Sequence, residues 1–108
     1  MMMQIATTPG SDRYLITVSG EVDLATSPEL DVAIIAAIDS GTLSVVIDLT
    51  DVSFMDSSGL GVIVRALKRC REAENDLDLV ITNERVLKVF GITGLDQVIP
   101  IHASIQDI

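Results

Sequence analysis

One segment of this chain combines two serines with an acidic residue and two glycines. It reads Phe54-Met55-Asp56-Ser57-Ser58-Gly59-Leu60-Gly61. Hydroxyls at the start of a helix lie beside free amide hydrogens and the positive end of the helix dipole, where a phosphoryl group is well accommodated. Gly59 and Gly61 remove side chains from the first turn, so a ligand or another backbone can approach closely. The segment predicts a modification or contact site, although an N-cap formed by Asp56 or Ser57 explains the same residues without any function.

The sequence lacks the residues that enzymatic catalysis, dinucleotide binding or metal binding would require. His102 is the only histidine and lies near the end of the chain, with no nucleophile motif to serve it. Gly59-Leu60-Gly61 resembles the start of a dinucleotide fingerprint, but residue 64 is valine where the third glycine belongs. No phosphate-binding loop or pair of metal ligands is present in the sequence. We therefore expect no enzyme activity, no cofactor and no metal.

The amino-acid composition bears on the partners and the cellular compartment that the protein can have. Seven basic and 16 acidic residues give a net charge of −9, which disfavours nucleic acid as a partner. A hydrophobic fraction of 48% argues against disorder. The longest apolar run, Val32 to Ile38, is far shorter than the ~20 residues that a membrane span needs. The N-terminus lacks the pattern of a signal peptide, and Cys70 is the only cysteine. These features favour the cytoplasm.

The first half of the chain predicts a hairpin and a helix. Gln4–Thr7 and Tyr14–Ser19 read as paired strands across a turn. A helix follows, with a capping box formed by Thr26 and Glu29 and a stop at Gly41.

The second half alternates strands and helices. We expect, in order, a buried strand at Val45–Ile47, a connection at Thr50–Met55, a helix from Asp56 to Asn75, a strand at Leu79–Ile81, a short helix from Asn83 to a stop at Gly91, and a strand at Val98–Ile99. The apolar face of the helix from Asp56 is predicted as Leu60, Ile63, Val64 and Leu67. Strands alternating with helices after a hairpin predict one α/β domain over residues 1–108, with a mixed sheet of four to five strands and about four helices.

Several blocks of this sequence together resemble a known family. They are Gly20-Glu21-Val22-Asp23 with Thr26 and Pro28, Asp48-Leu49, Val52 through Gly61, Val86-Leu87 to Phe90, and Ile92-Thr93-Gly94-Leu95. In this order and spacing they resemble the bacterial anti-sigma-factor antagonists of the STAS domain family, and the resemblance spans nearly the whole chain. Relatives often have a glycine pair where this chain has Asn75-Asp76. We expect Asn75 to supply the left-handed conformation at that turn.

The resemblance implies a partner-switching protein rather than an enzyme. In the unphosphorylated state such a protein binds an anti-sigma factor, usually also a serine kinase, and so releases a sigma factor. The kinase phosphorylates the serine after the motif aspartate, which here is Ser57, with Ser58 as second choice, and a metal-dependent phosphatase reverses this. Asp23, Asp56, Ser58, Gly59, Leu60 and Gly61 are then the switch-site neighbours and partner-binding residues.

Two alternatives remain open from the sequence. In one, the chain is a STAS interaction module in which Ser57 is only an N-cap and is never phosphorylated. In the other, it is a small nucleotide-binding protein that uses the turn at Gly59-Leu60-Gly61.

Overall fold

Five strands form one mixed sheet in which each strand pairs with the next strand in the chain. The computed structural model describes residues 2–108. The strands are β1 (Met3–Thr8), β2 (Tyr14–Val22), β3 (Ser44–Met55), β4 (Asp76–Val80) and β5 (Ile101–His102). The hairpin partners β1 and β2 are antiparallel, and all the later pairs are parallel. The predicted α/β domain with a mixed sheet is confirmed.

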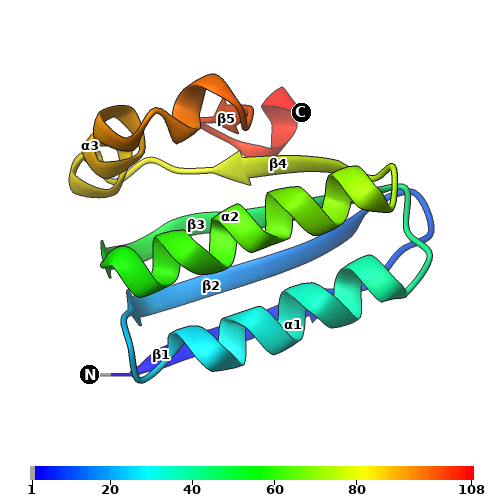
Figure 1. Ribbon diagram of the computed structural model, residues 1–108, viewed down its shortest axis with the longest axis horizontal. Coiled ribbons are helices and arrows are strands. Elements are labelled where there is room, and N and C mark those ends of the chain that lie inside the picture. Colours follow the sequence, from blue (N-terminus) through cyan, green and yellow to red (C-terminus); the bar gives the residue numbers. More distant parts are fainter. Residues whose placement is uncertain (1) are drawn as a thin grey trace.

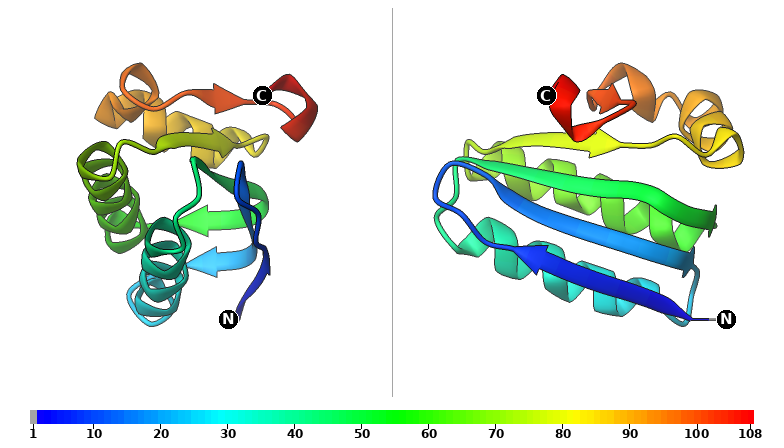
Figure 2. Two further views of the ribbon diagram at one scale, coloured as in Figure 1. Left: turned by 90° about the vertical axis from the view of Figure 1, so that its right-hand side faces the viewer. Right: turned by 180° about the vertical axis from the view of Figure 1, so that it is seen from behind.

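Three α-helices connect the parallel strands. They are α1 (Ser27–Asp39), α2 (Ser57–Glu72) and α3 (Glu84–Thr93), and short 3-10 turns follow at Leu95–Gln97 and Ile105–Asp107. Helices α1 and α2 lie side by side on one face of the sheet, while α3 lies beyond one end of β4 (Figure 1, and Figure 2 from two further sides). The core fills the layer between α1, α2 and the sheet, with contributions from Ile16, Ile34, Ile47 and Ile63, each at most 1% exposed.

The parallel connections bring the carboxyl ends of β2 and β3 and the first turns of α1 and α2 to one end of the molecule (Figure 1). A backbone hydrogen bond joins the end of β2 to the start of α2: the Asp56 amide donates to the Val22 carbonyl at 3.1 Å. The carboxyl end of a parallel sheet is where α/β proteins generally place their functional residues. We refer to this region as the switch end.

Strand β3 is longer than the sequence indicates. Residues 50–55, predicted as a connection, continue the strand and pair with β2, so that Val52 faces Gly20 and Met55 faces Val22. The prediction was wrong because this stretch lacks a strand's regular alternation: the buried residues Val52 and Met55 are three apart, and polar Thr50, Asp51 and Ser53 lie among the exposed ones. The extension places Asp56 directly at the end of the strand.

The buried face of α2 also differs from the predicted one. Its buried residues are Gly59, Val62, Ile63, Ala66 and Cys70. Of the predicted set, Ile63 is buried, Leu60 and Leu67 are half-buried, and Val64 is 46% exposed. The helix is rotated so that its smaller residues meet the sheet. Val64 therefore lies on the outer surface.

The boundaries of the later helices and strands differ by a few residues from the predicted ones. Helix α3 continues past Gly91 and ends at Gly94, whose φ of 77° is left-handed. The last strand is at Ile101–His102 instead of Val98–Ile99, although Ile99 is buried. At the end of α2 the left-handed residue is Glu74, with φ of 59°, and not Asn75. Pairing of β5 with Leu79 and Val80, which sequence patterns do not reveal, sets the position of that strand.

Candidate functional site

The Asp56 carboxylate caps α2. One of its oxygens accepts the amide hydrogen of Ser58 at 2.9 Å and that of Gly59 at 3.3 Å. These amides belong to the first turn, where no carbonyl of the helix can reach them. The same oxygen also accepts the Ser58 hydroxyl. Of the two predicted N-caps, Asp56 and Ser57, the structure assigns the role to Asp56.

The two serines consequently have different environments. Ser58 is half-buried and its hydroxyl is engaged by Asp56. Ser57 is exposed, and within residues 2–108 its hydroxyl makes no hydrogen bond. A reagent or enzyme in solution can therefore reach the Ser57 oxygen without breaking any contact.

The electrostatics of the cap favour an ionised Asp56. The hydrogen bond from the Ser58 hydroxyl is the largest influence, and it lowers the pKa of Asp56 below its ordinary 3.8. Partial burial opposes this, while the amides of Gly59, Ser58 and Leu24 add to the lowering. Asp56 thus presents a negative charge directly beside Ser57 at neutral pH.

Gly59 and Gly61 turn out to serve different purposes. A β-carbon built on Gly59 lies 2.7 Å from Met55 Cγ and 2.8 Å from Val22 Cγ1. Gly59 is therefore required for the close packing of α2 on the ends of β2 and β3, and the space predicted for a ligand is filled by the protein itself. Gly61 is different, because its β-carbon would meet only Arg65 Nη1, at 3.5 Å.

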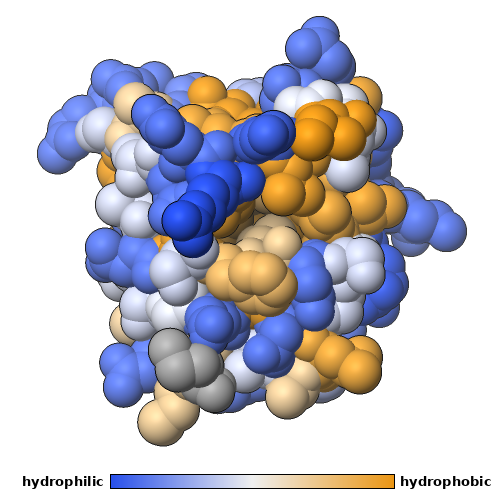
Figure 3. Space-filling view, turned by 90° about the vertical axis from the view of Figure 1, so that its left-hand side faces the viewer, coloured by the Kyte–Doolittle hydropathy of each residue, from blue (hydrophilic) through white to orange (hydrophobic). Residues whose placement is uncertain are grey.

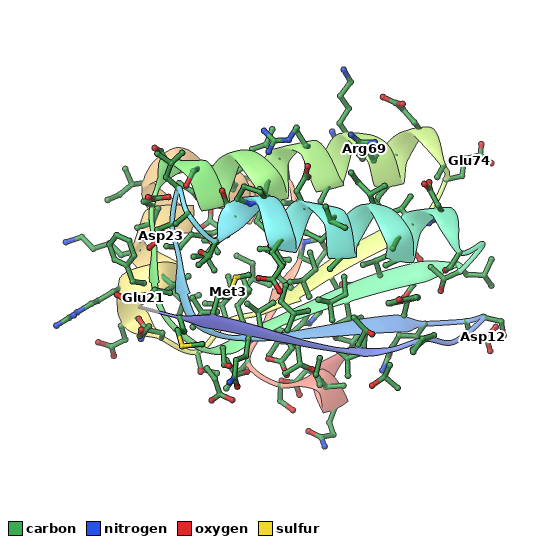
Figure 4. The ribbon with its side chains drawn as sticks, turned by 90° about the horizontal axis from the view of Figure 1, so that it is seen from below. Met3, Asp12, Glu21, Asp23, Arg69 and Glu74 are labelled. Carbon is green, nitrogen blue, oxygen red and sulfur yellow. The ribbon has the colours of Figure 1, made fainter. Side chains whose placement is uncertain are left out.

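Asp23 organises the second loop of the switch end, between β2 and α1. Its side chain accepts the amides of Ala25 and Thr26, each at 3.0 Å. The Thr26 hydroxyl accepts from the Asp23 amide at 2.9 Å and donates to the Glu21 carbonyl at 2.9 Å. Asp23 and Glu21 lie at the same end of the molecule in Figure 4.

The capping box predicted for α1 is absent from the described structure. Thr26 is the N-cap residue, but its side chain makes no capping hydrogen bond. Instead its hydroxyl is used within the Asp23 loop. Thr26 thus stabilises the loop that carries Asp23. The sequence did not indicate this role, because the spacing of Thr26 and Glu29 is that of a capping box.

Apolar side chains surround these polar loops. Leu24 is 78% exposed and Phe54 is 48% exposed. A hollow of about 530 Å³ lies next to Phe54, and its lining is Glu21, Ser53, Phe54, Met55, Arg85, Val86 and Val89. Figure 3 shows a depression on this side of the molecule, with orange, apolar surface along one edge and hydrophilic, blue surface along the opposite edge. Sequence patterns gave no sign of the hollow, because Arg85, Val86 and Val89 come from α3.

Outside the switch end, the described residues offer few groups of reactive side chains. Residues 2–108 contain no cluster of three or more potential metal ligands and no helix long and apolar enough to cross a membrane. His102 lies 2.8 Å from Asp78 on the neighbouring strand and is half-buried. This pair is at the β4–β5 edge, so it takes no part in the site around Ser57.

Together, the fold and the site define a small α/β domain with an exposed serine in the first turn of α2, at the carboxyl end of the parallel strands. Residues 3–108 match the model of the STAS domain. An anti-sigma-B factor antagonist of Staphylococcus epidermidis is 35% identical over 106 residues, covering 98% of each chain. The chain belongs to the STAS domain family.

Solved structures agree with this assignment. An anti-sigma factor antagonist from Mycobacterium paratuberculosis superposes with a TM-score of 0.90 at 25% identity, covering 98% of this chain and 90% of that one. The Bacillus cell fate determinant SpoIIAA in its phosphorylated form has the same fold, with a TM-score of 0.73 at 21% identity, covering 98% and 95%.

Proposed function

We propose that this protein is an anti-sigma-factor antagonist that acts by partner switching. Unphosphorylated, it binds an anti-sigma factor that is also a serine kinase, and so releases a sigma factor in the cytoplasm. Phosphorylation of Ser57 ends that binding, and a metal-dependent phosphatase restores it. The antagonist itself performs no catalysis in this scheme.

The free, exposed hydroxyl of Ser57 is the observation that carries the proposal. Ser58 is the second choice, and its hydroxyl is already held by Asp56. Phosphorylating Ser58 would remove that hydrogen bond and bring a phosphate onto an ionised carboxylate. Phosphorylating Ser57 requires neither change.

A phosphate at Ser57 can act through local charge alone. It adds about −1.5 to −2 charge at neutral pH, next to Asp56 and on a chain of net charge −9. Amides at the start of α2 can stabilise the phosphate, so the fold should endure. At an interface, an uncompensated charge typically costs about 2–5 kcal/mol. This corresponds to a loss of affinity of roughly thirty- to several-thousand-fold.

The partner surface that we infer combines the Asp23 loop, the Asp56 loop and the outer side of α2. It includes Asp23, Asp56, Ser58, Leu60 and Gly61. Gly59 supports this surface from beneath, since it packs on Val22 and Met55. That same packing counts against the nucleotide-binding alternative, because Gly59 has no room for a phosphate.

Binding measurements with the cognate anti-sigma factor test the function. Calorimetry should give a far larger dissociation constant for the protein phosphorylated at Ser57 than for the unphosphorylated wild type. Ser57→Asp should also bind more weakly. Equal affinity of the phosphorylated and unphosphorylated proteins would contradict the switch.

A separate measurement tests the alternative that the chain is a STAS interaction module that is never phosphorylated. After incubation with the cognate kinase and ATP, mass spectrometry of the peptides should locate the phosphate on Ser57. If no label appears on Ser57 or Ser58 while the anti-sigma factor still binds, the protein is a constitutive interaction module.

A further inference from the structure

Arg65 lies on α2 with its guanidinium group beside Gly61, which is one turn closer to Ser57 than Arg65 itself. Ser57, Gly61 and Arg65 follow one another at four-residue intervals, one helical turn apart. Side chains on a helix lean toward its N-terminus. Accordingly, Arg65 Nη1 lies 3.5 Å from the position that a β-carbon on Gly61 would occupy. Gly61, beside which the Arg65 guanidinium lies, is one turn from Ser57, about 6 Å along the axis.

The glycine at residue 61 is not explained by the fold. In the same helix, Gly59 is needed because Met55 and Val22 leave no room for a β-carbon. Gly61 has no such neighbour and no left-handed backbone angle. A glycine inside a helix costs about 1 kcal/mol relative to alanine. What the bare Gly61 surface provides is an unobstructed path between Arg65 and Ser57.

The present partner of Arg65 holds it weakly. Its Nε is 3.8 Å from Asp31 Oδ1 on α1, which is longer than a hydrogen bond, and the Arg65 side chain is 54% exposed. Exposed pairs of this kind contribute little and exchange easily. A phosphate offers several oxygens and about twice the charge of a carboxylate, and guanidinium groups bind it through two parallel hydrogen bonds.

We propose that Arg65 is a positioning residue for the phosphorylated switch: it leaves Asp31, lies across Gly61 and pairs with a phosphoryl group on Ser57. The inference rests on the proposed phosphorylation of Ser57. The pairing orders the phosphate on the outer surface of α2. It also leaves Asp31 without its cation, so the state of Ser57 changes the charge presented by α1.

A double-mutant cycle tests this pairing without any kinase. Phosphoserine is placed at residue 57 by genetic incorporation, and thermal unfolding is measured with and without Arg65→Gln, in both the serine and phosphoserine proteins. We expect Arg65→Gln to lower the unfolding midpoint by about 2–5 °C more in the phosphoserine protein than in the serine protein. Arg65→Lys should restore part of this difference.

Lys68→Gln is the matched control. Lys68 is also exposed on α2, but it is 11 residues from Ser57, about 16 Å along the axis. It should show no coupling to the phosphate. As a second readout, the Nε–Hε resonance of Arg65 should shift on phosphorylation, which a merely structural role would not produce.

The two hypotheses fail separately. Equal effects of Arg65→Gln in both proteins, with an unchanged Arg65 resonance, would overturn the pairing and leave the partner switch intact. Absence of phosphate on Ser57 after kinase treatment would contradict the proposed function, whatever the cycle shows.

Discussion

The Asp56 carboxylate accepts the hydroxyl of Ser58 and leaves the neighbouring Ser57 hydroxyl free. Two serines that look equivalent in the sequence thus differ in what they can do. Ser58 completes the N-terminal cap of α2, whereas Ser57 is exposed and its hydroxyl makes no hydrogen bond within residues 2–108.

Alanine substitutions at Ser57 and Ser58 should have different effects on the free energy of unfolding. Ser58→Ala removes a hydrogen bond to a carboxylate and should destabilise the protein by about 1 kcal/mol. Ser57→Ala removes a hydroxyl with no bonded partner and should stay within about 0.5 kcal/mol of the wild type. Urea unfolding of the two variants measures both values. A larger loss for Ser57→Ala would mean that its hydroxyl contributes to the cap after all.

Asp56 should make the stability depend on pH in the acid range. Its folded pKa lies below the ordinary 3.8, so the unfolded chain takes up a proton first as the pH falls. The contribution of ionised Asp56 is complete above pH 3.8 and is lost as the pH falls through the folded pKa. Asp56→Asn is the control, because asparagine also caps helices. The stability difference between wild type and this variant should shrink below pH 3.8, and a constant difference would be inconsistent with the lowered pKa.

Gly59→Ala and Gly61→Ala should change stability in opposite directions. At residue 59 the new methyl group would overlap Met55 and Val22, and such overpacking costs about 1–3 kcal/mol. The helix preference of alanine, about 1 kcal/mol, offsets part of this cost. At residue 61 the methyl group meets no overlap, so stability should rise by about 0.5–1 kcal/mol. Thermal unfolding of both variants gives the comparison, and a destabilised Gly61→Ala would show that residue 61 is packed more tightly than described.

Cys70 should resist alkylation in the folded protein. Burial raises the pKa of its thiol from 9.0 to about 11, and the residue is 1% exposed. The reactive thiolate is consequently scarce and shielded. Below pH 9.0, iodoacetamide labelling followed by mass spectrometry should be slow for the native protein and rapid in guanidinium chloride. Equal labelling rates would place the thiol at the surface.

Exposed apolar residues at the switch end should matter for binding and not for folding. Leu24→Ser replaces a side chain that is 78% exposed, and should leave the unfolding midpoint nearly unchanged while weakening anti-sigma-factor binding. Val32→Ser is the matched control, because Val32 is 68% exposed but lies on α1. Titration calorimetry of both variants should show weaker binding for Leu24→Ser alone. Similar affinities would exclude Leu24 from the interface.

The sequence predicts the order of the elements well because each is bounded by local chemistry. Asn83 caps α3 through the amides of Arg85 and Val86, as its position before the helix indicates. Tyr14 and Phe90 are both buried as core residues, as expected for large apolar side chains. The Asp56 segment likewise begins a helix: Asp56 is the N-cap, and α2 starts one residue later, at Ser57.

Features that depend on distant partners were not predictable in this way. The extension of β3 through Met55 relies on pairing with β2 across two register shifts, and neither strand reveals those shifts alone. The orientation of α2 depends on Gly59 packing against Val22, more than 30 residues earlier. The difference between Ser57 and Ser58 depends on the rotation of one carboxylate. No pattern of residue types encodes it.

The order of the sheet has a consequence for how the protein is made. Because every strand pairs with its sequence neighbour, no strand has to wait for a distant part of the chain in order to find its partner. Pairing with the next strand in the chain closes a shorter loop, at a smaller entropic cost, than pairing with a more distant strand would. During synthesis on the ribosome, β1 to β3 and their helices can therefore assemble as they emerge. The loops around Asp23 and Asp56 would then take shape before α3 and β5 have been translated.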